Sequence, residues 1–248
     1  MTIIHRQHRF IYLKSFKTAG TSVEAHLLTR TRLGGDLWST SSEILNHGLP
    51  QKSPKTALFV WRGRVYAFNR RSLLVRAWSD RWRPRIVEHQ TASDLASQLG
   101  EFWLRAIKVT SVRNPWDILV SAWQWRRDGR GGRAEPIDTG FHAWASAALS
   151  GDDDMQKRCG AYDARNLMHP FVLIDGKVAI DHFIRQEAIN DGLDSLSKQL
   201  GLKLGHIAIR EKTSSRTRDY RPYYNEALAD QVAVYFSDFI ELTQYSFE

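Results

Sequence analysis

The fold is indicated by one stretch near the N-terminus, Arg9-Phe10-Ile11-Tyr12-Leu13-Lys14-Ser15-Phe16-Lys17-Thr18-Ala19-Gly20-Thr21-Ser22. Its first five residues form a short β-prone run, and apolar residues then recur at Val23, Leu27 and Leu28 with the period of a helix. The stretch therefore predicts a strand, a loop and a helix. A loop between a parallel strand and a helix directs backbone N–H groups and the helix N-terminus toward one point, which suits an anion.

The loop also carries side chains that can hold an anion. Ala19 and Gly20 let the backbone approach closely, and Lys17 can reach the oxygens of the ligand. Three hydroxyls can donate further hydrogen bonds, those of Thr18, Thr21 and Ser22. The order of residues differs from the Walker A pattern GxxxxGK[ST], because the lysine precedes the glycine. An ordinary Ser/Thr helix cap beside a solvated lysine would explain the same residues, and the segment alone does not choose between the two.

A second strand-to-helix junction follows in the middle of the chain. Residues 104–112 predict a strand, and Asn114-Pro115 supplies an N-cap and a first helical residue. Arg113 stands just ahead of this helix and Ser121 lies two turns into it, so both can grip one phosphate. In the alternative, Arg113 pairs with Asp117 at the start of the helix.

The remaining pattern extends the same architecture. We expect a helix from Thr91 to Leu99 with a capping box, a hairpin at Arg62-Gly63, strands at 171–174 and 178–184 around Asp175-Gly176, a helix ending at Leu200, and a last helix over 225–242. Strand–loop–helix units at the N-terminus and in the middle predict an α/β fold with a parallel sheet. The sequence has no internal repeat and no long linker, so residues 1–248 are expected to form a single domain.

Composition excludes several classes of protein. The 248 residues are 42% hydrophobic and 25% charged, which is globular rather than disordered composition. No apolar run approaches the roughly 18–20 residues of a membrane-spanning helix, and the basic residues between His5 and Arg9 interrupt any signal-peptide core. Cys159 is the only cysteine, which fits a reducing compartment, so we expect a cytoplasmic protein.

Positive charge is concentrated in one segment. Between Trp61 and Arg85, eight arginines stand against a single acid, Asp80, which accounts for nearly all of the net charge of +8. Trp61, Trp78 and Trp82 are interleaved with these arginines. A basic surface without a ligand, a nucleic-acid site and a site for another polyanion all fit this pattern.

The two junctions together resemble the signature segments of the sulfotransferases that use 3′-phosphoadenosine 5′-phosphosulfate (PAPS). The resemblance rests on Lys17-Thr18-Ala19-Gly20-Thr21-Ser22 and on Arg113-Asn114-Pro115-Trp116-Asp117 with Ser121, and it is closest to the carbohydrate-type branch. Weaker likenesses lie at 88–92, 184–187, 220–224 and 245–247. Phe16 stands where this family usually has proline, and Ala19 where a second glycine is common.

The resemblance implies a P-loop-like three-layer α/β fold, with a central parallel sheet flanked by helices. It implies that Lys17 to Ser22 bind the 5′-phosphosulfate and that Arg113 and Ser121 bind the 3′-phosphate. Arg216, within the Arg-rich loop 210–221, is a further candidate for the 3′-phosphate.

The implied reaction moves a sulfuryl group from PAPS to a hydroxyl or amine of a carbohydrate-like acceptor. Lys17 would stabilise the leaving phosphate, and His89 would act as base ahead of Glu88. We expect no metal, because lysine and arginine supply the positive charge. The partner is then a small-molecule or glycan acceptor, anionic or sugar-like and held by the arginines of 62–85, and not a nucleic acid.

Two other functions compete with this interpretation. A nucleotide kinase or NTPase would share the fold class, but it needs a Walker-type lysine and a metal-binding acid after a strand. A nucleic-acid-binding module would explain the arginines of 62–85 but leaves both anion loops without a role.

Overall fold

The computed structural model describes residues 2–31, 37–39, 56–61, 64–69, 89–129, 136–207 and 219–247, the three short segments among them by backbone alone. The chain divides into two compact units. The first combines Met1–Val112 with Pro170–Thr213, and the second combines Arg113–His169 with Ser214–Glu248. The single domain expected for 1–248 stays a prediction.

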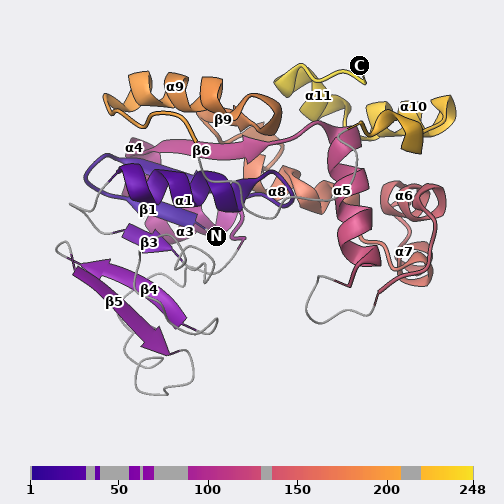
Figure 1. Ribbon diagram of the computed structural model, residues 1–248, viewed down its shortest axis with the longest axis horizontal. Coiled ribbons are helices and arrows are strands. Elements are labelled where there is room, and N and C mark those ends of the chain that lie inside the picture. Colours follow the sequence, from indigo (N-terminus) through magenta and orange to yellow (C-terminus); the bar gives the residue numbers. More distant parts are fainter. Residues whose placement is uncertain are drawn as a thin grey trace. The chain divides into compact units, whose positions relative to one another are not determined.

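A mixed sheet forms the centre of the first unit (Figure 1). Its described strands run in the order β5-β4-β3-β1-β2-β6-β9. Their bounds are β1 Thr2–His5, β2 Phe10–Leu13, β3 Leu37–Ser39, β4 Thr56–Trp61, β5 Arg64–Asn69, β6 Ile107–Val112 and β9 His182–Arg185. The pairs β2·β6 and β6·β9 are parallel, whereas the other pairs are antiparallel.

The α/β class is thus confirmed, but the described sheet is mixed: β2, β6 and β9 pair in parallel as expected, whereas the other four strand pairs are antiparallel. The physical reason lies in the length of the connections. Four residues join β1 to β2, and two residues join β4 to β5. A parallel pair needs a crossover of a dozen or more residues, so these strands can pair only antiparallel.

Helices cover both faces of this sheet. The helices are α1 Gly20–Arg30, α3 Ala92–Leu99, α4 Glu101–Arg105 and α9 Ile189–Leu200, with the short 3₁₀ turn η3 at Gln186–Ala188. Alternate residues of β1 and β2 point to opposite faces, as the pleat requires.

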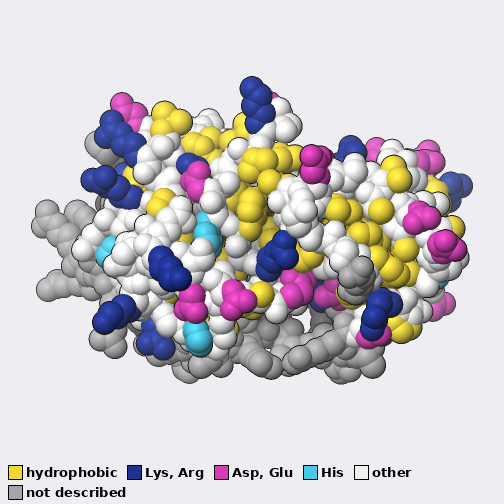
Figure 2. Space-filling view, turned by 90° about the horizontal axis from the view of Figure 1, so that it is seen from above, with side chains coloured by type: hydrophobic (Ala, Val, Ile, Leu, Met, Phe, Trp, Pro, Cys, Tyr) yellow, Lys and Arg dark blue, Asp and Glu magenta, His cyan; other side chains and the backbone are white. Residues whose placement is uncertain are grey.

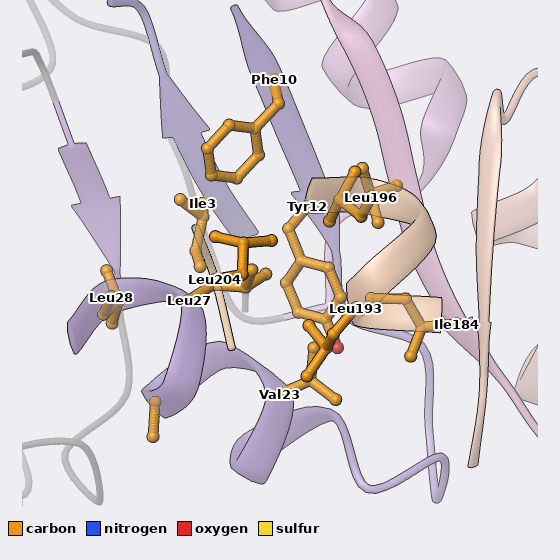
Figure 3. Close-up of a cluster of buried hydrophobic side chains, with 12 residues drawn as sticks. Ile3, Phe10, Tyr12, Val23, Leu27, Leu28, Ile184, Leu193, Leu196 and Leu204 are labelled. Atoms are coloured by element: carbon orange, nitrogen blue, oxygen red, sulfur yellow. The ribbon is translucent and has the colours of Figure 1, made fainter. Parts of the chain in front are cut away.

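One face packs against α1 and α9. Ile3, Phe10 and Tyr12 meet apolar side chains of both helices there, and Figure 3 shows the side chains converging. Ile4, Ile11 and Leu13 pack on the other face with α3 and α4. The first unit therefore has three layers.

Most of the expected local structure of the first unit is confirmed. Thr91 caps α3 with a complete capping box, and Trp61 pairs with Arg64 in the expected β4·β5 hairpin. Asp175 and Gly176 join β7 (Leu173–Ile174) to β8 (Lys177–Val178). Both turn residues have positive φ, 49° and 72°, as a type I′ turn requires.

Three expected boundaries are wrong. The strand expected over 104–112 begins at Ile107, because 101–105 form α4, in which Arg105 and Glu101 pair one turn apart. Residues 171–172 belong to the short helix α8 (His169–Val172) rather than to a strand. Likewise, the strand expected over 178–184 is interrupted between β8 and β9.

The second unit is helical. Its elements are α5 Pro115–Arg127, α6 Phe141–Ser150, α7 Asp153–Cys159, η2 Ala164–Leu167, η4 Arg221–Tyr223, α10 Glu226–Tyr235 and α11 Ser237–Thr243. Trp116, Trp144 and Phe236 are buried in it. The single helix expected over 225–242 is two helices, because the chain leaves helical geometry at Phe236, whose φ is −106°.

The described surface carries charged side chains of both signs as well as hydrophobic ones. Basic and acidic side chains are both scattered over the face shown in Figure 2. In the described part of the chain, none of the helices has the length and apolar character needed to cross a bilayer. Cys159 is half-buried and carries a free thiol.

Candidate functional site

A chain of hydroxyl groups braces the loop between β2 and α1. The Ser15 hydroxyl donates to the carbonyl oxygen of Ser111 in β6 and lies 2.9 Å from Thr18 Oγ1. The Tyr12 hydroxyl lies 2.6 Å from Ser111 Oγ and donates to the Gly20 carbonyl oxygen at 3.4 Å. Burial raises the pKa of Tyr12, so its phenol stays protonated and remains a donor. The loop is therefore fixed to two strands and to the start of α1.

Lys14 is a buried lysine that the sequence analysis did not single out. Its Nζ donates to Thr21 Oγ1 at 2.7 Å and lies 3.6 Å from a carboxylate oxygen of Glu24, which is fully buried. The lysine stem covers Gly20 so closely that a Cβ on Gly20 would lie 2.5 Å from Lys14 Cγ. Gly20 is thus required because Lys14 packs over it. The sequence does show two residues of opposite charge on either side of the loop, Lys14 and Glu24. Their spacing alone does not show that both are buried.

The loop backbone alternates in handedness. Lys17 and Ala19 have φ of 60° and 56°, the left-handed region, on either side of Thr18. Such alternation turns successive N–H groups toward one side and forms a concave anion-binding site. Helix α1 begins at Gly20, and no side chain of the described residues caps it. This differs from the ordinary Ser/Thr cap considered in the sequence analysis, and it leaves the first turn of α1 to attract an anion.

The predicted hydroxyl donors of this loop differ in their surroundings. The Thr18 and Thr21 hydroxyls bond within the protein, to Ser15 and Lys14 respectively. Ser22 is buried as well, whereas Lys17 is only half-buried. The backbone and the Lys17 side chain, rather than these hydroxyls, are therefore the groups best suited to hold a ligand.

The predicted base, His89, lies against the same loop. Its Nδ1 is 3.0 Å from the carbonyl oxygen of Lys14. Its ring stacks on Phe16 with a centroid distance of 3.9 Å and an interplanar angle of 20°. Phe171 meets the rings of both Phe16 and His89 edge-on, at 5.5 and 6.2 Å. The structure thus brings His89 to the residue that precedes Lys17.

The second junction begins the second unit. Arg113 directly follows β6, and its Nε donates to Asp117 Oδ2 at 2.7 Å. This is the pairing that the sequence left open as an alternative. The Arg113 side chain is only 9% exposed. Ser121 lies half-buried further along α5.

Asn114 has the N-cap role expected from the sequence and a further one. Its side-chain oxygen accepts from the backbone N–H groups of Trp116 and Asp117. Its amide nitrogen donates to the Tyr220 hydroxyl at 3.1 Å and to the Ser246 carbonyl oxygen at 2.8 Å. One side chain therefore joins the start of α5 to two segments of the C-terminal region.

Aromatic residues of these two segments gather around the same turn. The Tyr224 hydroxyl donates to the Trp116 carbonyl oxygen at 2.8 Å. Phe247 contacts the rings of Trp116, Tyr220 and Tyr224 at centroid distances of 5.5 to 5.8 Å. The weak likenesses noted at 220–224 and 245–247 therefore meet at the Arg113-Asn114-Pro115-Trp116 segment.

Several predicted site residues lie outside the described residues. These are Glu88, Arg216 and all arginines of 62–85 except Arg64, of which only the backbone is described. Their proposed roles stay predictions. Among the described residues, no group of three or more His, Cys, Asp or Glu side chains is arranged to hold a metal ion.

Comparison of the chain with family models, with curated proteins and with solved structures finds no match in any of the three.

Proposed function

We propose that the chain is a PAPS-dependent sulfotransferase with a P-loop-like fold, which transfers a sulfuryl group to a hydroxyl or amine of a carbohydrate-like acceptor. The observation that carries the proposal is the contact between an imidazole and a loop of the type that binds anions. Lys17 lies in a backbone segment of alternating handedness at the start of α1, and His89 stacks on its neighbour Phe16.

The loop fits the phosphosulfate end of the donor. Helix α1 has eleven residues and starts without a side-chain cap from the described residues, so its N-terminus favours a negatively charged group. Lys17 adds a full positive charge beside that backbone. The brace from Ser15 to β6 supports the assignment, because a loop held before the ligand arrives loses little freedom on binding.

The reaction divides between two side chains. The acceptor oxygen forms a bond to sulfur, while the bond between sulfur and the bridging phosphate oxygen breaks. His89 accepts the proton that the acceptor hydroxyl loses, and Lys17 stabilises the charge that develops on the leaving phosphate. His89 thus assists the formation of the new bond to sulfur, and Lys17 assists the breaking of the old one.

Arg113 and Ser121 are assigned to the 3′-phosphate of the donor. A guanidinium has five N–H donors, and Asp117 accepts from the one on Nε. This bond fixes the orientation of the planar guanidinium. The sequence resemblance supports this assignment, because it gives the Arg and the Ser of the second segment the role of binding the 3′-phosphate.

Binding of adenosine 3′,5′-bisphosphate tests the proposal without an acceptor. We expect binding heat in the presence of EDTA and, at roughly 100 times the dissociation constant, stabilisation by about 2.7 kcal/mol. ATP with magnesium and an oligonucleotide are the comparison ligands. Tighter binding of either one than of the bisphosphate would favour the kinase or the nucleic-acid interpretation and would overturn the proposal.

Two substitutions separate binding from chemistry. Lys17→Ala should lower kcat about 100-fold, because it removes a group that acts on the developing charge. Arg113→Ala should mainly raise the KM for PAPS, because the 3′-phosphate is remote from the reacting sulfur. Lys198→Ala, in an exposed position of α9, is the control and should change neither constant. Near wild-type turnover of Lys17→Ala at saturating PAPS would show that the assignment of Lys17 is wrong.

A further inference from the structure

The hydrogen bond of His89 determines which of its ring nitrogens carries the proton. Nδ1 lies 3.0 Å from the Lys14 carbonyl oxygen. A carbonyl oxygen only accepts hydrogen bonds, so Nδ1 must be the donor. In the neutral ring the lone pair is then on Nε2.

The orientation of the same ring is set by Phe16 and Phe171. Phe16 lies nearly parallel to the imidazole at 3.9 Å, and Phe171 presents its edge to both rings. Aromatic rings prefer such stacked and edge-on arrangements, so the two phenylalanines favour one orientation of the imidazole. Rotation of the imidazole within this stack would place a carbon atom at the Lys14 carbonyl and would lose the hydrogen bond.

The backbone of His89 adopts an uncommon conformation. His89 has a φ of 57°, in the left-handed region. That conformation is uncommon for residues with a Cβ, although histidine adopts it more readily than most. Phe16 is the contact at the surface, since it is 37% exposed, whereas Phe171 is buried. Phe16 is therefore the contact that can be changed with the least effect on the core.

We infer that Phe16 is a positioning residue for His89. Together with the Lys14 carbonyl, it holds the imidazole in the Nδ1–H tautomer, so that Nε2 is the nitrogen that accepts the proton of the acceptor. The role of Nε2 rests on the proposed function, whereas the tautomer and its dependence on Phe16 do not.

Nitrogen NMR of the imidazole tests the tautomer without any assay of activity. The protein is labelled with ¹⁵N and measured at about pH 8.5, two units above the ordinary histidine pKa near 6.5. His89→Gln identifies the signals of His89 among the nine histidines. We expect a protonated Nδ1 and an unprotonated Nε2 in the wild type, and two tautomers in exchange in Phe16→Leu.

Two further variants make this measurement specific. Phe16→Tyr keeps the ring and should keep the single tautomer. Phe102→Leu, which removes a half-buried phenylalanine of α4, should leave the signals of His89 unchanged. An Nε2–H tautomer in the wild type, or an unmixed tautomer in Phe16→Leu, would overturn the inference.

Kinetics then test the link between the tautomer and the reaction. Phe16→Leu should lower kcat about tenfold, which corresponds to about 1.4 kcal/mol, with an unchanged KM for PAPS. Phe16→Tyr should restore most of that loss. If the wild-type protein has the expected tautomer but transfers no sulfuryl group, the proposed function is refuted. The role of Phe16 in orienting His89 would not be affected by that result. Equal kcat values for active wild type and Phe16→Leu would refute the positioning role itself.

Discussion

Acid should destabilise the first unit through one buried histidine in β1. His5 is fully buried, and this burial, together with the neighbouring His8, lowers the pKa of His5 from 6.5 to about 4. Above about pH 6.5, neither the folded nor the unfolded chain protonates this ring. Between pH 6.5 and about 4 the unfolded chain takes up a proton that the folded chain does not, so stability falls as the pH falls. One pKa unit corresponds to about 1.4 kcal/mol, and the loss should reach about 3 kcal/mol near pH 4.

Urea unfolding at several pH values, with wild type and His5→Asn, measures this contribution. Asparagine keeps an acceptor for the backbone N–H of His8, which bonds to His5 Nδ1 at 3.2 Å, but it does not titrate. Burial also lowers the pKa of His26, so only the difference between the two proteins isolates His5. His142→Asn, at an exposed position of α6, is the control and should follow the wild type. If His5→Asn loses as much stability as the wild type between about pH 7 and pH 4, the argument from burial is refuted.

Five substitutions near the two junctions test these contacts, and their expected effects on stability differ in sign or size. Ala19→Gly removes a Cβ from a left-handed position and should raise the thermal midpoint by about 2–4 °C, whereas Ala25→Gly inside α1 should lower it. Gly20→Ala forces a Cβ against Lys14 and should lower the free energy of unfolding by about 1–3 kcal/mol; an unchanged urea midpoint would show that the lysine stem moves aside freely. Asn114→Ala should lower the free energy of unfolding by about 1–2 kcal/mol or more. Asn114→Asp keeps the N-cap of α5 but not the amide N–H donor, so it should recover part of that loss in the same measurement.

Local structure was predictable wherever neighbouring residues decide it. Thr91 and Asp94 are three residues apart, so their capping box is visible in the sequence and is present in the structure. The same holds for Asn114-Pro115 at the start of α5 and for the turn at Asp175-Gly176. In these cases the interacting groups lie within a few residues of each other.

Contacts between distant segments were not predictable from the same patterns. Nothing in the spacing shows that Lys14 is buried with Glu24, or that the ring of Phe16 meets that of His89. The parallel sheet was expected because strand–loop–helix units favour it, but only β2, β6 and β9 pair in parallel, and the short connections force β1·β2 and β4·β5 to be antiparallel. Arg113 shows the same limit at the site, since the sequence allowed both a phosphate contact and the observed pair with Asp117.

The brace between Ser15 and Ser111 has a consequence for the order of folding. These two residues are 96 positions apart in the chain, and the Thr110 hydroxyl bonds to the Leu13 carbonyl oxygen across 97 positions. Contacts of such long range form late, because closing a large loop of chain costs entropy before the contacts compensate for it. The β1–β2 hairpin can form early, but the loop after β2 obtains its shape only when β6 has paired beside it. An anion that binds this loop would therefore stabilise only the product of the last refolding step. It would leave the rates of the earlier steps unchanged.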